Sequence, residues 1–264
     1  AALALTPRIL HGLFRMRPGV ACNLYSRDSP AWLPMVELAM QTMEAQELFV
    51  SWSKAARLPS YTELNYESPG SLGDKGLRRQ TGETTEIGWR GFVDEVWLRS
   101  LLFFEHSRDV IDWGKDDPES RWNAINMDKV TTRGFLLEST YRPSEDLALS
   151  LDYQATTKDG HQAPYASRYV LDYARHAVNA SITVAPTRHV TLWFRQGLAR
   201  YRRNPAREGR ATRFDGSLQA RVRTPVERLL CTVGVENIAD HDFQVLPDRS
   251  VAGRRWHVGV DYSW

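Results

Sequence analysis

The fold is decided by the stretch DLALSLDYQA, which occupies residues 146–155. Leucine or tyrosine occupies every second position from Leu147 to Tyr153, and small or polar residues lie between them. Alternation with a period of two is typical of a β-strand that has one apolar and one polar face. The stretch RWHVGVDYSW, residues 255–264, repeats the pattern. The sequence therefore predicts an all-β protein.

The same alternation recurs along most of the chain. Helical propensity competes with it only around Met35–Glu47, and there we expect a strand, Met35 to Thr42, that turns at Glu44-Ala45 into the next strand. The further alternating stretches are 33–43, 46–54, 82–90, 94–106, 134–141, 176–184, 190–198, 214–223 and 229–236. Together these stretches indicate about twelve strands.

The connections alternate between short and long. We expect tight links near 44–45, 91–93, 142–145, 185–187 and 224–226, several of which contain Gly or Pro. Longer polar connections are expected at 23–32, 55–79, 107–121, 158–167, 202–211 and 239–252. Outer-membrane barrels sort their loops in this way, with short periplasmic turns and long outer loops, whereas a soluble sandwich has no reason to do so.

The two faces of the expected strands agree with a membrane barrel. The polar faces carry bulky charged residues that suit a wet lumen: Arg221, Arg223, Glu236, Arg255 and Asp261. The apolar faces carry aromatic residues near strand ends, as in an interfacial girdle: Trp89, Tyr141 and Trp264. We therefore predict a transmembrane antiparallel up-and-down β-barrel, with a large soluble β-barrel or sandwich as the alternative.

Composition excludes several other classes. The 264 residues carry a net charge of only +2, which is low for a dedicated nucleic-acid binder. No apolar run reaches the roughly 18 residues of a transmembrane helix. Cys22 and Cys231 are too few for a disulfide framework. The chain opens without Met or a signal peptide, so we expect that a leader was removed or that this is the later part of a longer protein.

The end of the chain resembles a known signal. Residues 257–264, HVGVDYSW, place Gly259, Tyr262 and the terminal Trp264 as in the last strand of bacterial outer-membrane barrels. The resemblance implies that these three residues form a barrel-assembly signal, which the assembly machinery reads by pairing with a free strand edge.

A second segment, SWSKAARLPSYTEL at residues 51–64, resembles the strand and loop start of TonB-dependent receptors, where the pattern Tyr-x-Ser-x-x-x-Arg-x-Pro-Ser-x-x-Glu-Leu is common. The family usually continues with Asn-x-x-Leu-x-Pro-Glu, and this chain departs from that pattern with Asp74, Leu77, Arg79 and Gln80. Four later segments also resemble the family: 86–89, 103–113, 126–138 and 235–240.

The resemblance spans 46–264 and implies much about the whole protein. Family barrels have about 22 strands, so residues 1–264 correspond to the C-terminal part of one barrel, without the N-terminal plug and the early strands. It implies TonB-energised uptake of a scarce nutrient, such as a ferric siderophore or cobalamin, across the outer membrane of a Gram-negative cell. Expected partners are outer-membrane lipid, lipopolysaccharide, the barrel-assembly machinery, a small-molecule or metal-chelate ligand, and TonB through the missing plug.

Ligand contacts are expected in the outer loops, because aromatic and Arg side chains make good anchors. The candidates are Arg57, Tyr61 and Tyr66 in loop 55–79 and Trp113 in loop 107–121, with loop 239–252 as a further region. Packing or girdle roles remain open for each. The basic stretch from Arg200 to Arg213 is expected outside the cell, where it would meet lipopolysaccharide phosphates or an anionic ligand, or be a solvated loop.

No motif indicates catalysis, a cofactor or a metal site. Asp240-His241-Asp242 contains metal-ligand residue types, but adjacent residues on an extended segment point to opposite sides. A nucleophile elbow, a phosphate-binding loop and a dinucleotide fingerprint are absent from the sequence. We therefore expect no enzyme activity and no nucleic-acid partner. Two other functions stay open: a self-contained barrel of about twelve strands acting as a passive pore or outer-membrane enzyme, and a soluble all-β binding domain.

Overall fold

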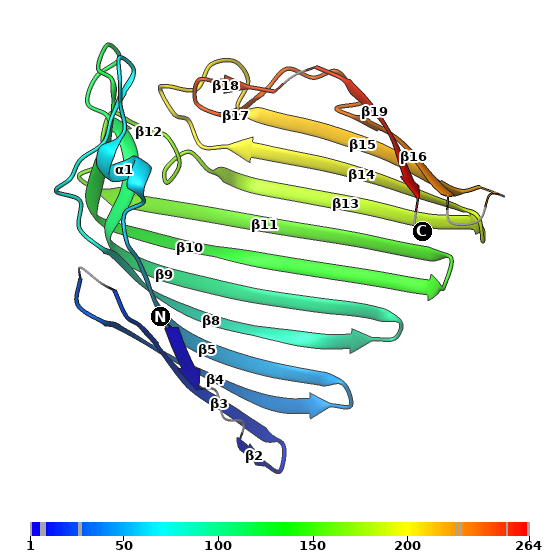
Figure 1. The fold of residues 1–264 in the computed structure, drawn as a ribbon. Coiled ribbons are helices and arrows are strands. Elements are labelled where there is room, and N and C mark those ends of the chain that lie inside the picture. Colours follow the sequence, from blue (N-terminus) through cyan, green and yellow to red (C-terminus); the bar gives the residue numbers. More distant parts are fainter. Residues whose placement is uncertain are drawn as a thin grey trace.

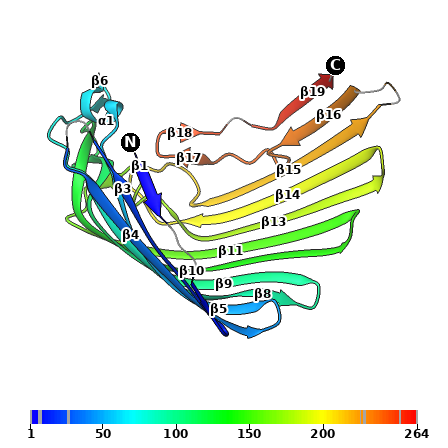
Figure 2. The same cartoon turned by 60° about the horizontal axis from the view of Figure 1, so that its bottom comes forward.

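The computed structural model describes residues 2–5, 9–25, 28–224, 226, 229–251 and 253–262, and most of them belong to one curved, mainly antiparallel sheet (Figures 1 and 2). The sheet contains 17 strands, and a separate hairpin contains β17 and β18. The strands are β1 (Ala2–Leu5), β2 (Ile9–His11), β3 (Phe14–Asn23), β4 (Ala31–Met43), β5 (Gln46–Arg57), β6 (Glu67–Ser68), β7 (Ser71–Leu72), β8 (Gln80–Val93), β9 (Val96–Lys115), β10 (Trp122–Ser144), β11 (Leu147–His161), β12 (Ala166–Ser167), β13 (Ala174–Thr187), β14 (Val190–Tyr201), β15 (Thr212–Arg223), β16 (Leu229–Glu236), β17 (Gln244–Leu246), β18 (Arg249–Ser250) and β19 (Arg255–Tyr262). Within the described residues the only helix is α1 (Tyr61–Asn65), and no helix is long and apolar enough to cross a membrane.

Twelve of these strands have eight or more residues, and they run up and down in chain order, each antiparallel to the next. This confirms the predicted meander and the strand at Met35–Thr42. The sheet is not closed: β19 pairs with β16, and it lies far from β2 in Figure 1 and far from β3 in Figure 2. The described residues thus form a trough, which is part of a barrel wall.

Short hairpins lie at one end of the trough and long connections at the other, as predicted. We name these ends the turn end and the loop end. The turn at 44–45 is confirmed, with Ala45 at φ 58°. The next three turns lie at 94–95, 145–146 and 188–189, one to three residues later than predicted, because the strands continue past the Gly and Pro residues that suggested turns. Gly91 is paired on both sides, and Pro143 and Pro186 lie in bulges after which pairing resumes. Asp94 at φ 52° supplies the left-handed conformation of the second hairpin.

The predicted loop 107–121 is wrong over most of its length. Strand β9 continues to Lys115 and β10 begins at Trp122, so that only 116–121 connect them. This extension is paired on its outer edges by short strands from other connections: β7 runs parallel to the start of β10, and β12 pairs with the end of β9. Those extra pairings satisfy the backbone groups of a strand that projects beyond the main sheet.

The convex face of the sheet is apolar and exposed. One hydrogen-bonded row joins Met16, Leu38, Val50, Ile87 and Leu102 across five strands. Each of these side chains is between 39% and 59% exposed. A continuous exposed apolar surface of this kind requires hydrocarbon rather than water next to it. The fold is therefore that of a transmembrane barrel wall, and the soluble alternative fails on this face.

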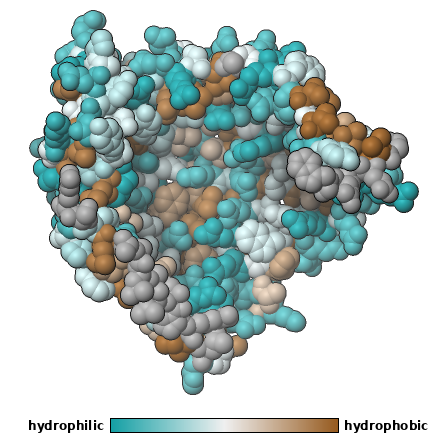
Figure 3. All heavy atoms as spheres, viewed as in Figure 1, coloured by the Kyte–Doolittle hydropathy of each residue, from teal (hydrophilic) through white to brown (hydrophobic). Residues whose placement is uncertain are grey.

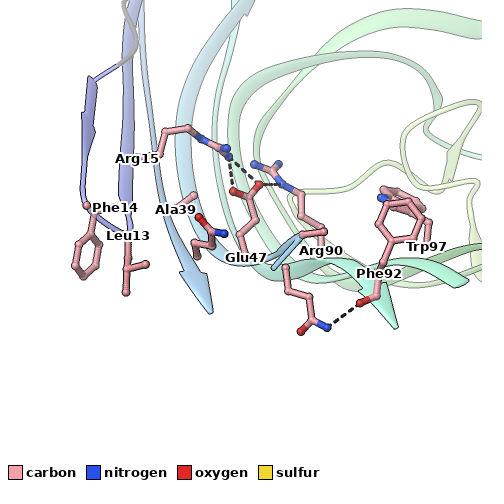
Figure 4. Close-up of a pocket in the computed structure, with 13 residues that line it drawn as sticks. Leu13, Phe14, Arg15, Ala39, Glu47, Arg90, Phe92 and Trp97 are labelled. Carbon is pink, nitrogen blue, oxygen red and sulfur yellow. Dashed lines mark hydrogen bonds and ion pairs between the residues drawn. The ribbon is translucent and has the colours of Figure 1, made fainter. Parts of the chain in front are cut away.

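The concave face is mixed, and its centre is hollowed (Figure 3). Ala39, Phe49 and Leu101 form a small buried cluster there, against which Phe103 and Leu136 pack. Charged side chains flank that cluster toward the turn end (Figure 4). Alternating side chains thus separate an apolar outer face from a polar inner face along the strands, as the sequence predicts.

Candidate functional site

Helix α1 lies at the loop end, and residues 60–63 determine where the helix starts. Ser60 caps it: the Ser60 Oγ accepts from the Glu63 amide at 3.2 Å, and the Ser60 amide donates to the Glu63 carboxylate at 2.7 Å. This reciprocal arrangement is a capping box. Burial pushes the pKa of Glu63 upward, but hydrogen bonds from Arg57 and Ser60 hold the pKa below its usual value.

Arg57 attaches this helix to the sheet. Its guanidinium donates to both Glu63 carboxylate oxygens, at 3.0 and 2.9 Å, and to the Ile111 carbonyl at 3.3 Å. Arg57 thus joins the end of β5, the start of α1 and the extended part of β9. The predicted candidate Arg57 is engaged within the protein, although 45% of its side chain remains exposed.

The three aromatic candidates differ in how exposed their side chains are. Tyr61 on α1 is 82% exposed. Tyr66, which follows the helix, is 48% exposed and meets Trp113 edge to face, with ring centroids 6.3 Å apart. Trp113 is only 8% exposed and packs with Trp122, Ala124 and Ala166. Of the predicted residues, Tyr66 and Trp113 are in contact, and Arg57 anchors the helix that carries Tyr61.

Asp112 ties the 162–173 connection to β9. Its carboxylate accepts from the hydroxyl of Ser167 and from the amides of Trp113, Tyr169 and Val170, the amide distances being 2.8, 3.1 and 3.2 Å. Asp112 is among the most buried side chains of the described residues. Burial raises the pKa of Asp112, against the effect of these four hydrogen bonds.

A buried ion pair links the 162–173 connection to the 202–211 connection. Arg207 and Asp172 are in contact at 2.5 Å, with side-chain exposures of 5% and 0%. Arg207 also donates to the Gln244 carbonyl at 2.5 Å and stacks over the Tyr201 ring at 4.1 Å. The Trp122 indole N–H donates to Asp248 at 2.8 Å. The long connections are therefore cross-linked into one layer over the loop end.

A cleft of about 1050 Å³ opens beside α1 in this layer. Its lining includes Tyr25, Leu64, Lys75, Arg78 and Arg79. Arg78 pairs with Asp109 at 2.5 Å and Arg79 with Asp28 at 3.2 Å, so the arginines are partly neutralised. The cleft combines a phenol, apolar side chains, three cations and the carboxylates of Asp28 and Asp109, so its lining has one more cation than anion, which suits an anionic organic molecule.

The predictions missed the cationic wall of this cleft. The signal was present in the run KGLRR at residues 75–79, where Arg79 was considered only as a departure from a motif. The region 239–252 contributes Gln244 and Asp248 to bracing contacts. No cluster of three or more potential metal ligands exists among the described residues, including Asp240, His241 and Asp242.

A charged network lies on the inner face toward the turn end (Figure 4). Arg15 and Arg90 both point at Glu47, and both also contact Glu37, at 3.3 and 3.0 Å. The Arg90 guanidinium lies 4.6 Å above the Phe49 ring. These four charged residues come from β3, β4, β5 and β8. Three of them, Arg15, Glu47 and Arg90, line a cavity of about 450 Å³. The network faces the space that the trough encloses.

The predicted assembly signal is only partly within the described residues. Gly259 pairs with Thr232 and Tyr262 with Leu229 on the last strand, β19, whose other edge has no partner among the described residues. Tyr262 is 59% exposed. Trp264 lies outside the described residues. A free strand edge is the feature that such a signal would present, and its role stays a prediction.

Comparison with known proteins decides the family. Residues 14–238 match the family model described as TonB dependent receptor-like, beta-barrel. The chain belongs to this family. One curated relative is the vitamin B12 transporter BtuB of Vibrio vulnificus (strain YJ016), which is 23% identical over 95 residues, 36% of this chain and 15% of that protein.

Solved structures of this TonB-dependent receptor-like barrel family share the fold. The siderophore receptor PirA from Pseudomonas aeruginosa has a TM-score of 0.70 at 17% identity, covering 100% of this chain and 46% of its own. The ferric enterobactin receptor PfeA from Pseudomonas aeruginosa, as a mutant in complex with enterobactin, has a TM-score of 0.73 at 15% identity, with coverages of 100% and 45%. The copper transporter OprC has a TM-score of 0.70 at 15% identity, with coverages of 96% and 45%. The chain thus spans less than half the length of these receptors.

Proposed function

We propose that this chain forms the carboxyl-terminal barrel wall of an outer-membrane receptor that takes up a scarce nutrient with energy from TonB. The family match over 14–238 carries this proposal. The nutrient class is a ferric siderophore, cobalamin or a similar metal chelate, since the related proteins are a vitamin B12 transporter, siderophore receptors and a copper transporter. Within the receptor, this chain would form part of the barrel wall and contact the ligand, and it would carry out no catalytic step.

The layer at the loop end would receive the ligand from outside the cell. Tyr61 and Tyr66 present aromatic surface, and the cleft beside α1 adds Lys75, Arg78 and Arg79. Arg57 and Trp113 would hold α1 and Tyr66 in place, because they contact Glu63 and Tyr66 respectively. Aromatic rings and cations together suit an anionic chelate, whose rings stack and whose charge pairs.

The inner face would contact the plug of the complete receptor. Arg15, Glu37, Glu47 and Arg90 place two cations and two carboxylates toward the enclosed space. A mixed-charge wall of this kind offers ion pairs to a polar plug that must also move, since half-hydrated pairs exchange partners at low cost. TonB itself would act through that plug and not through this chain. Outer-membrane lipid, lipopolysaccharide and the assembly machinery, which would read Gly259, Tyr262 and Trp264, complete the proposed partners.

Uptake by the complete receptor tests the proposal. Cells that make the receptor containing this chain should accumulate labelled cobalamin or a labelled ferric siderophore, and a strain without TonB should not. Tyr61→Ala together with Lys75→Gln should raise the half-saturating ligand concentration about tenfold, which corresponds to about 1.4 kcal/mol of binding energy. The control Arg142→Gln changes an exposed cation at the turn end and should leave uptake unchanged. Uptake that persists without TonB would contradict the proposal.

A further inference from the structure

Three arginines on the convex face differ from the cations of the inner face. They are Arg133 on β10, Arg175 on β13 and Arg200 on β14, and all three are exposed. Within the described residues, no carboxylate lies within the 4.0 Å ion-pair distance of any of these three guanidinium groups, whereas Arg15, Arg90 and Arg99 on the inner face each have a Glu partner. Three exposed cations without a protein carboxylate on one outer surface are free to pair with an anion from elsewhere.

These cations sit where the apolar surface ends. The hydrogen-bonded row that runs through Leu102 continues to Phe135, Ala155, His176 and Arg200. Because the strands of a barrel are tilted, a row of paired residues climbs from the apolar band toward the loop end. On β14, Leu198 is 46% exposed and Arg200 is the next residue on that face. On β10, Phe135 is followed on the same face by Arg133.

Two of these cations, Arg133 and Arg175, line a single hollow, and Arg200 lies beside it. An open depression of about 620 Å³ is lined by Arg133, Thr157, Arg175 and His176 above and by Leu102 and Phe135 below. Arg200 is the direct cross-strand partner of His176, so their Cβ atoms lie about 5 Å apart. His176 is held in place by Tyr153, whose hydroxyl lies 2.9 Å from Nδ1 and whose ring stacks on the imidazole. The hollow therefore has a cationic upper rim and an apolar floor.

Resting on the proposed membrane location, we propose that this hollow binds the phosphate group of an outer-leaflet lipid. The guanidinium groups of Arg133, Arg175 and Arg200 would pair with the phosphate oxygens, and the acyl chains would run over Leu102 and Phe135. Arg matches phosphate in geometry as well as charge, because its planar fork donates two parallel hydrogen bonds. Charge complementarity and continuity with the apolar band favour a lipid as the occupant, because a free anion would gain nothing from contact with the apolar floor of Leu102 and Phe135.

Other charged residues lie on the same outer face. On β5 and β8, which β9 separates from β10, Lys54 and Glu83 form an ion pair at 3.4 Å. Asp159 lies two positions beyond Thr157 on β11 and forms no ion pair with a described cation. Arg133, Arg175 and Arg200 lie on β10, β13 and β14, and Arg108 on β9 and Lys129 on β10 are further exposed cations on this face that form no ion pair among the described residues.

The test uses the complete receptor, purified from outer membranes in detergent and studied by native mass spectrometry with added diphosphoryl lipid A. The triple variant Arg133→Gln/Arg175→Gln/Arg200→Gln should bind this lipid at least tenfold more weakly than the unchanged protein. The variant with Lys at all three positions should retain most of the binding, which shows that the loss follows charge. The control Arg142→Gln/Arg188→Gln/Arg223→Gln removes three exposed cations at the turn end and should bind normally.

Two further probes separate a lipid site from other outcomes. Lipid A without its phosphates should bind no better to the unchanged protein than to the Gln triple variant, and inorganic phosphate at equal concentration should not compete. Equal binding by the Gln variant and the unchanged protein would overturn the proposal, as would full competition by inorganic phosphate. Nutrient uptake is measured in parallel: lost uptake with intact lipid binding rejects the transport proposal alone, and intact uptake without phosphate-dependent lipid binding rejects the lipid site alone.

Discussion

Charged groups are organised differently at the loop end and on the inner face near the turn end. At the loop end, Arg207 and Asp172 form one pair whose side chains are 5% and 0% exposed. On the inner face, Arg15 and Arg90 share Glu37 and Glu47, and all four side chains are 17–24% exposed. A single buried pair leaves an isolated charge when one partner is removed, whereas a shared network near water keeps a second partner. The comparison teaches that the loop layer is fixed and the inner face is adjustable.

The largest effect is expected from Arg207→Ala. It leaves the buried carboxylate of Asp172 without its cation and frees the Gln244 carbonyl, so the docking of the 202–211 connection should weaken by about 3–5 kcal/mol. Hydrogen exchange of the complete receptor measures this as faster exchange at residues 202–211 and 242–246. The matched control is Arg210→Ala on the same connection, an exposed residue whose loss should change exchange by less than about 0.5 kcal/mol.

Equal exchange in the Arg207→Ala and Arg210→Ala proteins would contradict the idea of a fixed loop layer. The double variant Arg207→Met/Asp172→Leu sharpens the test, because it removes both charges. It should recover a large part of the lost protection if the isolated charge, rather than the lost contacts, causes the weakening.

Asp112→Asn should have the next largest effect. The amide keeps one acceptor oxygen, so at least one of the four donors from Trp113, Ser167, Tyr169 and Val170 loses its partner in a buried place. An unsatisfied buried donor costs about 1–3 kcal/mol. Exchange at the amides of Tyr169 and Val170 should accelerate accordingly. Unchanged exchange at these two amides would show that Asp112 does not hold the 162–173 connection.

The period-two alternation of the sequence decides how much of the fold could be predicted. Alternation predicted the strands from Met35 onward, because each has lipid on one side and the enclosed space on the other. The extension of β9 does not alternate. Residues 110–114 are buried on both sides because other connections cover them, and a strand buried on both faces reads as a continuous run rather than an alternation. The loop prediction failed there for this reason.

The candidate site was predictable only in part. Tyr61 and Tyr66 lie in the connection that the sequence assigned to the loop end, and Arg57 is the last residue of β5 before it. Trp113 lies beside Tyr66 as a buried strand residue. Pairs such as Arg207 and Asp172 are 35 residues apart on different connections. No periodic pattern reports which of several charged residues on long connections will meet, because this depends on how the connections fold over one another.

On the inner face a smaller loss is expected. Arg90→Gln removes one cation from Glu37 and Glu47, but Arg15 still contacts both carboxylates. We expect the complete receptor to lose about 1–2 kcal/mol in urea unfolding followed by gel mobility of unboiled samples. Lys54→Gln is the control, since its pair with Glu83 lies on the outer face with exposures of 38% and 51%. That change should cost less than about 1 kcal/mol. A loss as large as that of Arg207→Ala would abolish the contrast between the two regions.

The smallest effect concerns pH and helix α1. The pKa of Glu63 is held below its usual value in the folded protein, mainly by hydrogen bonds from Arg57 and Ser60 that outweigh burial. A carboxylate with a lowered folded pKa stabilises the folded state above its unfolded pKa, and this contribution is lost as the pH falls through the folded pKa. Protection of the Leu64 and Tyr66 amides, corrected for intrinsic exchange, should therefore fall between neutral pH and pH values below the usual Glu range. Glu63→Gln should remove this pH dependence and cost about 1 kcal/mol of local stability at neutral pH. If the protection of these two amides still falls with acid in the Glu63→Gln protein, the pH dependence belongs to another group, because the glutamine has no proton to gain.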